Sequence, residues 1–272
     1  MYISIFIFLL GLIVGSFLNV VILRLDENFN SKTLMGRSYC PKCKKTLHWY
    51  ELVPVFSFLI QGGKCRGCKN KISWQYPIVE IITGLMFLII YNLQFTAYSG
   101  VFSDYFLLST FYFLTIFSIL IVITVYDMYH KIIPDSLVFL FAGLSFLFLL
   151  VTNWGHVTWL QVLSGPILAT PFALLWLVSS GRWIGFGDAK LALGIGWFMG
   201  LIDGISALVL AFWIGSVFGI FLIILSRLHS LLFKNKNFTI KSEIPFAPFL
   251  VLGMILIFFF GWDVLGLKGF LM

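Results

Sequence analysis

Charged residues are scarce in this chain. They make up 11% of its 272 residues, whereas 60% are hydrophobic. Soluble domains carry about 25% charged residues, so this composition excludes an ordinary water-soluble core. It indicates a polytopic membrane protein whose expected partner is the lipid bilayer. The net charge of +7 then reports on membrane orientation, and no nucleic-acid partner is expected.

Breaks between apolar windows divide the chain into eight candidate spans, and windows of the ~20 apolar residues needed to cross hydrocarbon recur along the chain. The spans cover roughly 3–23, 77–96, 106–126, 136–152, 159–179, 188–201, 205–226 and 246–262. No Lys or Arg precedes the first stretch and no small-residue cleavage site follows it, so we expect an anchor and not a secretory signal. The predicted fold is all-α, with about eight transmembrane helices.

Basic residues are concentrated in one loop, which is therefore predicted to be cytoplasmic. Ten of the eighteen Lys and Arg lie there: Arg24, Lys32, Arg37, Lys42, Lys44, Lys45, Lys64, Arg66, Lys69 and Lys71. If the spans alternate, the same side also receives Lys131, Arg182, Lys190, Arg227, Lys234, Lys236 and Lys241, leaving only Lys268 outside. The predicted division is a first transmembrane helix at 1–23, a cytosolic loop domain at 24–76 and a transmembrane core at 77–272.

Two carboxylates fall at membrane edges on this predicted cytoplasmic face. Asp127 follows 21 uncharged residues that begin at Phe106, and an acid at the C-terminal end of a helix is disfavoured by the helix dipole. Asp188 opens another helix within Gly185-Phe186-Gly187-Asp188. Acids at such places are functional candidates, and two that share one proton could activate a water molecule. Asp127 and Asp188 are therefore the candidate catalytic pair.

Other polar residues near helix ends have simpler interpretations. Asp135 follows Pro134 and precedes an apolar run, so it is predicted to cap the next helix. Glu80 lies one turn inside a helix, where capping suffices, although Glu80 and Glu51 could also attract a basic peptide. The two glycines, Gly185 and Gly187, could leave room for an extended substrate.

Small residues at every fourth position predict close helix packing. Three pairs show this spacing: Gly11 with Gly15, Gly196 with Gly200, and Gly215 with Gly219. Asn19 follows the first pair by one turn, and we expect its amide to hydrogen-bond a neighbouring helix.

Cysteine is rare, and all four cysteines lie in the predicted cytosolic loop. They form two C-x-x-C pairs, Cys40 with Cys43 and Cys65 with Cys68, separated by 21 residues. This is one residue beyond the usual spacing of a zinc ribbon. Because cytosolic thiols stay reduced, the pattern predicts a structural zinc site, with a redox pair as the alternative.

Between the cysteine pairs, Leu52 to Ile60 form an apolar run that is too short to cross a bilayer. Aromatic residues at its edge, Trp49 and Tyr50, are typical of the headgroup region. We expect this run to lie in the membrane interface.

Motifs along nearly the whole chain resemble the type IV prepilin peptidases, the bacterial branch of the GxGD intramembrane aspartyl proteases. They are Gly15-Ser16-Phe17-Leu18-Asn19-Val20, the four-cysteine loop, Tyr76-Pro77-Ile78-Val79-Glu80, Asp127 through Asp135, Gly185 to Lys190, and Pro245-Phe246-Ala247-Pro248-Phe249. Ala247 is a departure, because the family pattern usually has Gly at that position.

The resemblance implies a membrane aspartic endopeptidase with Asp127 and Asp188 as its catalytic acids. Such enzymes remove the basic leader of prepilins or pseudopilins, in type IV pilus or protein secretion systems, on the cytoplasmic side of the inner membrane. Many then methylate the new N-terminus with S-adenosylmethionine as methyl donor. Within this scheme helix dipoles favour Asp188 as the ionised base and Asp127 as the protonated acid.

Two other classes fit part of the sequence. Tyr126-Asp127 suggests an intramembrane protease similar to presenilin or signal peptide peptidase, but the four-cysteine loop argues against it. A transporter or scaffold with a zinc-ribbon docking module, whose acids relay protons, needs no enzyme activity.

Overall fold

The computed structural model describes residues 2–25, 36–98, 104–232 and 244–266, with the side chains of α9 described as far as residue 225. Of the basic residues counted for the topology, Lys32, Lys234, Lys236, Lys241 and Lys268 lie outside the described residues, as does the side chain of Arg227. All regular structure in the described parts is helical apart from two isolated β-bridges. The predicted all-α fold is confirmed.

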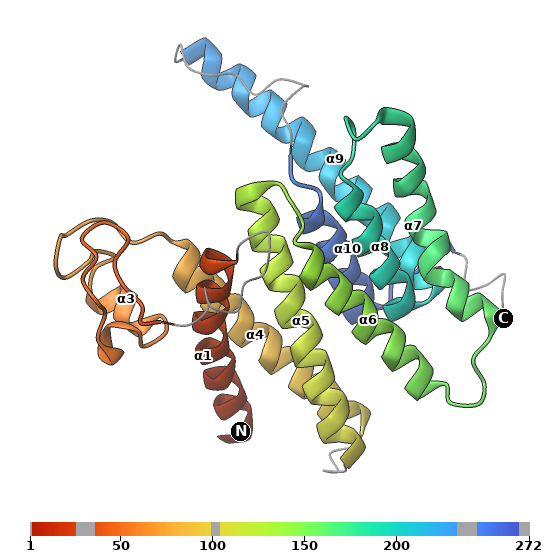
Figure 1. Ribbon diagram of the computed structural model, residues 1–272, viewed down its shortest axis with the longest axis horizontal. Helices are drawn as coiled ribbons and strands as arrows, with labels where there is room; N and C mark the ends of the chain where they lie inside the picture. The colour runs from red at the N-terminus through yellow and green to blue at the C-terminus, as the bar shows by residue number, and fades with distance from the viewer. Residues whose placement is uncertain (1, 26–35, 99–103, 233–243, 267–272) are drawn as a thin grey trace. The chain divides into compact units, whose positions relative to one another are not determined.

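Eight helices coincide with the eight predicted stretches, and two short helices lie between the first and second of them (Figure 1). The elements are α1 (Tyr2–Arg24), η1 (Trp49–Glu51), α3 (Phe56–Ile60), α4 (Gln75–Ala97), α5 (Asp104–His130), α6 (Asp135–Thr152), α7 (Trp159–Ser179), α8 (Phe186–Met199), α9 (Leu201–Leu232) and α10 (Ala247–Phe260).

Six of these helices are long and apolar enough to cross a membrane: α1, α4, α5, α6, α7 and α9. Helices α8 and α10 have 14 residues each, which gives a length of about 21 Å at 1.5 Å per residue. The hydrocarbon core is about 30 Å thick, so these two helices are short for a full crossing. The expected count of about eight spans is thus approximate.

The chain forms two compact units, residues 1–122 and 123–272. Unit 1 contains α1, η1, α3, α4 and α5 as far as Val122; unit 2 contains the end of α5 from Ile123 and all later helices. The three-part division predicted from the sequence follows the expected membrane topology and stays a prediction.

In unit 1, α1 and α4 pack side by side. A Cβ at Gly11 would lie 2.7 Å from the Gly84 Cα, and one at Gly15 would lie 2.7 Å from the Glu80 Cα. Only glycine allows so close an approach, and the predicted packing role of this pair is confirmed. Asn19 is buried, and its Nδ2 donates to the Tyr76 carbonyl of α4 at 3.1 Å. The expected interhelical bond of Asn19 is therefore also present.

In unit 2, α8 packs against α6, α7, α9 and α10. Gly196 faces α7 closely, since a Cβ there would lie 2.7 Å from the Gly165 Cα. Gly200 does not belong to this contact: it ends α8 with φ of 80°, and a Cβ there would touch nothing within 4 Å. The predicted packing role of Gly200 was wrong because a turn between α8 and α9 needs the glycine. A Cβ at Gly215 would meet Phe246 and Phe249 at an ordinary 3.5 Å.

Candidate catalytic site and metal centre

Asp127 lies in the last turn of α5, three residues before its end at His130. The residue is only 4% exposed, although the helix around it is apolar. Its Oδ2 accepts a hydrogen bond of 3.2 Å from the backbone N–H of Ala247, the first residue of α10. A residue 120 positions away therefore orients this carboxylate.

Asp188 is the third residue of α8 and is 8% exposed. Gly185 is the N-cap of this helix, with φ of −73°, a conformation open to any residue. Gly187 is different: a Cβ there would lie 2.9 Å from the Ile133 Cβ. The space beside Gly187 is filled by Ile133, which lies six residues after Asp127. The substrate-binding roles of Gly185 and Gly187 stay predictions.

Several contacts within unit 2 bring the two acids together. Ile133 packs on Gly187, α10 packs on α8, and Ala247 at the start of α10 binds Asp127. The Asp127 and Asp188 carboxylates lie within range of direct Coulombic interaction. Two buried like charges repel strongly, so this arrangement is costly unless the acids share a proton.

Two features of the structure have opposite effects on which of the two acids is the ionised base. Asp188 lies at a helix start and Asp127 at a helix end, which favours charge on Asp188. The N–H of Ala247 works the other way, because a donor stabilises the charged form of Asp127. The assignment of Asp188 as base stays a prediction.

Asp135 does not cap α6, contrary to the expectation. The N-cap is Pro134 and no side chain caps the helix. The Asp135 carboxylate instead accepts from Lys190 Nζ at 2.6 Å, and the same ammonium lies 5.1 Å from the Phe139 ring centre and 5.2 Å from that of Phe186. Lys190 follows Asp188 by two residues, so this cluster fixes the start of α8 against the start of α6. Its partners are 55 residues apart, and no local pattern in the sequence could pair them.

The four cysteines of unit 1 converge on one point. All four Sγ atoms lie within 4.8 Å of one another. Cys40 and Cys68 are 3.9 Å apart, and Cys43 and Cys65 are 4.0 Å apart. Tetrahedral zinc with Zn–S bonds of about 2.3 Å needs sulfurs roughly 3.8 Å apart, so these residues fit a zinc ion.

The two cysteine pairs have the same backbone geometry. Cys40 accepts at its carbonyl from the N–H of Lys44 at 2.9 Å, and Cys65 accepts from Lys69 at 2.9 Å. Lys44 and Lys69 both have φ of 58°. The backbone N–H of Cys43 lowers the pKa of Cys40 to about 6 against the opposing effect of burial. In the same turn the pKa of the Cys43 thiol is raised to about 11: the Lys45 N–H lowers it, but burial and the neighbouring cysteines outweigh that effect. Metal binding requires thiolates, so the turn favours the binding form at Cys40 and not at Cys43.

Glu51 is buried beside this centre and is fully engaged. Its Oε2 accepts from the His48 N–H at 3.0 Å, and its Oε1 pairs with Lys45 Nζ at 3.3 Å. The hydrogen bond from His48, and then the Lys45 charge, lower the pKa of the Glu51 carboxyl against the effect of burial. These contacts give Glu51 a structural role; its expected attraction for a basic peptide stays a prediction.

Glu80 is 6% exposed and also binds backbone. Its Oε2 accepts from the Val55 N–H at 2.7 Å. Val55 has φ of 59° and ψ of −51°, an unfavourable conformation for a β-branched residue. The hydrogen bond to Glu80 helps to hold this strained turn. A role of Glu80 in substrate binding stays a prediction.

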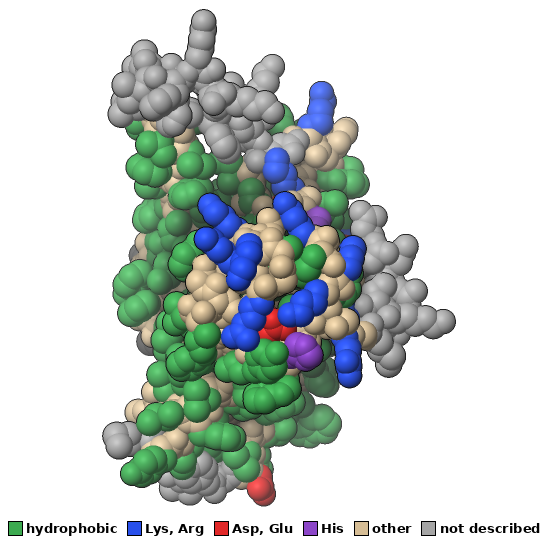
Figure 2. All heavy atoms as spheres, turned by 90° about the vertical axis from the view of Figure 1, so that its left-hand side faces the viewer, with side chains coloured by type: hydrophobic (Ala, Val, Ile, Leu, Met, Phe, Trp, Pro, Cys, Tyr) green, Lys and Arg blue, Asp and Glu red, His purple; other side chains and the backbone are tan. Residues whose placement is uncertain are grey.

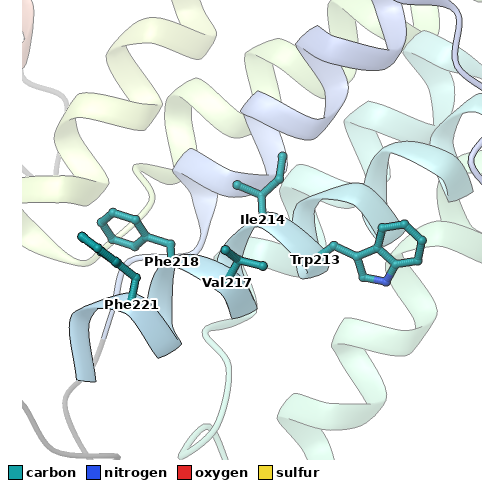
Figure 3. Close-up of a pocket in the computed structure, with 5 residues that line it drawn as sticks. All are labelled: Trp213, Ile214, Val217, Phe218 and Phe221. Carbon is teal, nitrogen blue, oxygen red and sulfur yellow. The ribbon is translucent and has the colours of Figure 1, made fainter. Parts of the chain in front are cut away.

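Figure 3 shows a hollow on one face of α9, and no acidic residue lines it. It has a volume of about 430 Å³ and is lined by Trp213, Ile214, Val217, Phe218 and Phe221. All five side chains are apolar, so the hollow offers no group for acid–base chemistry.

Two family descriptions match the chain. Residues 9–94 match the Bacterial Peptidase A24 N-terminal domain, and residues 114–224 match the Type IV leader peptidase family. The first match includes all four cysteines and Glu80, and the second includes Asp127 and Asp188.

Three similar proteins carry the name Prepilin leader peptidase/N-methyltransferase. The Bacillus subtilis protein is 28% identical over 95% of this chain and 94% of its own length. The Myxococcus xanthus protein is 32% identical over 81% of this chain and 63% of its own length, and the Pseudomonas aeruginosa protein is 28% identical over 90% and 86%. No solved structure matches the chain.

Proposed function

Because the chain belongs to the type IV leader peptidase family, we propose that it is a membrane aspartic endopeptidase that removes the leader peptide of prepilins or pseudopilins and then methylates the new N-terminus. The similar proteins are named for both activities. With its six long apolar helices, the chain is a multi-pass protein of the bacterial inner membrane. Neither the presenilin-like reading nor the transporter reading is favoured.

One observation carries the proposed peptidase activity: the two acids of the second family match are buried in one unit with interacting charges. In the proposed reaction, one carboxylate takes a proton from water as the water oxygen attacks the scissile carbonyl carbon. The protonated partner hydrogen-bonds the carbonyl oxygen. Collapse of the tetrahedral intermediate breaks the C–N bond, and the amine leaves with a proton.

In this proposal Ala247 is a positioning residue for the Asp127 carboxylate. Its N–H on Asp127 Oδ2 fixes which carboxylate oxygen can face the partner acid. Fixed donors reduce the rearrangement needed when charge moves between the acids.

The second proposed activity transfers a methyl group from the sulfonium of S-adenosylmethionine to the amine that cleavage has released. The described residues contain no strand-loop-helix unit of the kind that holds this cofactor in a Rossmann fold. We therefore name S-adenosylmethionine as the methyl donor and assign no residue to it.

We further propose a structural zinc ion held by Cys40, Cys43, Cys65 and Cys68. When bound, zinc would cross-link the two turns that carry the cysteine pairs. Part of the metal-binding free energy then becomes folding free energy of this module.

The proposed active face is cytoplasmic. The excess of Lys and Arg in the loop that carries the cysteines supports this orientation. A leader peptide that stays in the cytoplasm would meet the two acids on that side.

The test is cleavage of a purified prepilin by the full-length protein in nanodiscs, followed by mass spectrometry of both products. Asp127→Asn and Asp188→Asn should each abolish cleavage. The matched control is Asp104→Asn, because Asp104 is exposed at the opposite end of the same helix as Asp127. Normal cleavage by Asp127→Asn or by Asp188→Asn would rule out the proposed mechanism.

A further inference from the structure

The module formed by residues 36–74 of unit 1 has two unlike surfaces. One is basic: Figure 2 shows Lys and Arg side chains gathered over one face. The exposed basic residues of the module are Arg37, Lys42, Lys44, Lys64, Arg66, Lys69 and Lys71. The only acid among these residues is Glu51, which is buried and paired with Lys45.

The other surface is apolar and belongs to α3 and the turn before it. Ile60 is 74% exposed, Leu59 64% and Phe56 57%, with Leu52 and Val53 exposed beside them. A water-soluble module rarely exposes so many large apolar side chains in one short segment. We call the segment Leu52–Ile60 the apolar edge.

The depth of the apolar edge follows from the packing of α1 on α4. Glu80 faces Gly15, which lies nine residues before the end of α1 at Arg24 and thus about 14 Å along the helix axis. Both helices are candidate membrane spans. The Glu80 carboxylate reaches Val55 in the apolar edge at 2.7 Å. Since a glutamate side chain is only a few ångströms long, Val55 lies deeper than Arg24.

The backbone of the apolar edge is suited to this depth. Glu80 accepts from Val55, Pro54 accepts from Phe56, and Val53 accepts from Ser57. Leu59 then donates to Val55, as the short helix begins. Backbone donors that enter the hydrocarbon must find partners in the protein, and these bonds supply them where the edge reaches the acyl chains. Pro54 has no N–H to satisfy.

We propose that the cysteine module is docked on the bilayer surface, with the apolar edge inserted at the boundary of headgroups and acyl chains and the basic residues bound to anionic phospholipid headgroups. Helices that lie in the interface insert apolar faces by ~5–10 Å. Lys and Arg side chains near an anionic membrane surface are attracted to it, and the attraction falls off within a Debye length. A bilayer matches both surfaces at once, whereas a basic leader peptide would be repelled by the Lys and Arg.

The test uses the full-length protein with a fluorescent amino acid built in by codon expansion at Ile60 or, as the control, at Thr46. Thr46 is an exposed polar residue of the first cysteine turn, outside the apolar edge. Each protein is placed in nanodiscs of phosphatidylcholine alone or of equal phosphatidylglycerol and phosphatidylcholine, with and without a lipid carrying a nitroxide near the headgroup. Zinc content verifies that each labelled module has folded.

The proposal predicts quenching on the order of twofold at Ile60 and little quenching at Thr46, as expected for an interfacial helix. In phosphatidylglycerol nanodiscs, raising the salt from 0.1 to 1 M shortens the Debye length from ~10 Å to ~3 Å and should reduce the quenching at Ile60. No quenching at Ile60 would show that something other than lipid covers the apolar edge. Equal quenching at both sites, or no dependence on phosphatidylglycerol, would also overturn the proposal. The readout needs no substrate, so its outcome is separate from that of the proposed activity.

Discussion

Each unit buries two carboxylates, but the surroundings of the carboxylates differ between the units. In unit 1, Glu51 and Glu80 each accept a backbone N–H within that unit, and Glu51 also has a lysine partner. In unit 2, Asp127 also accepts a backbone N–H, from Ala247, but Asp127 and Asp188 lie in addition within Coulombic range of one another. Burial alone therefore does not indicate catalysis. A buried acid that stabilises its surroundings has a structural reason to be there, whereas two buried acids within Coulombic range of one another favour a functional one.

The largest expected effect is a loss of cleavage without a loss of thermal stability when either buried acid of unit 2 is replaced. Asp127→Asn or Asp188→Asn should reduce cleavage by at least ~10³-fold, since general acid–base groups contribute about 10²–10⁴-fold each. The thermal midpoint should not fall, because each change removes a costly buried carboxyl group and asparagine at position 127 can still accept from Ala247. Cleavage rates and thermal unfolding in the same nanodiscs check this. A variant that loses both activity and stability would contradict the comparison.

Removal of the metal ligand tests the cysteine module. Cys40→Ser should lower methyl transfer more than cleavage, on the order of 10–100-fold against a smaller change, if the module serves the second reaction. Parallel assays of leader release and methyl incorporation measure the two effects, with zinc content as the accompanying readout. Equal loss of both activities would instead show a general folding role for zinc.

Substitution of Glu80 should affect stability first. Glu80→Ala leaves the Val55 N–H without its partner and should cost about 1–3 kcal/mol of unfolding free energy. Glu80→Gln keeps an acceptor and should recover most of that loss. Thermal unfolding of both variants measures this contrast.

The Gln variant also tests the expected role in leader binding. If its KM for the basic leader is unchanged across salt concentrations, Glu80 does not attract the leader. A salt-dependent rise in KM with normal stability would establish that attraction and weaken the structural account.

The two glycines before Asp188 should respond unequally. Gly187→Ala brings a Cβ to 2.9 Å from Ile133, whereas the nearest atom to a Cβ at Gly185, Asp188 Oδ2, is 3.7 Å away. Overpacking costs about 1–3 kcal/mol, so Gly187→Ala should reduce cleavage on the order of tenfold and Gly185→Ala much less. Initial rates on one prepilin give the comparison. A larger loss at Gly185 would favour its predicted contact with substrate.

The Lys190 ion pair should have the smallest effect. Asp135 is 64% exposed at its side chain, and exposed pairs contribute about 0–1 kcal/mol. Lys190→Met keeps much of the apolar stem over Phe139 and Phe186. Its thermal midpoint should stay near that of the parent, and a large drop would show that the cluster organises the start of α8 more strongly.

Local patterns predicted much of this structure. Apolar windows located eight helices, of which six are long enough to cross a membrane, and four-residue spacing located the contact of Gly15 with α4. The C-x-x-C pairs anticipated the sulfur cluster, because a short turn brings the two cysteines of each pair together. The approach of the two turns, with Cys40 beside Cys68 and Cys43 beside Cys65, is a tertiary contact. The prediction for Asp135 failed since its partner, Lys190, lies on another helix. The Ala247 bond to Asp127 spans 120 residues, and no periodicity encodes such a tertiary contact. The expected stretch 188–201 already has the 14 residues of α8. The expected stretch 246–262 is longer than the 14 residues of α10, because it includes the caps Phe246 and Gly261.

The most direct test of the central claim is single-turnover cleavage by four proteins: the parent, Asp127→Asn, Asp188→Asn and the double variant. Groups that act as one unit are not additive, so each single variant should be as inactive as the double variant. If one single variant keeps measurable cleavage and the two losses add in the double variant, the acids act independently and the proposed catalytic pair is contradicted.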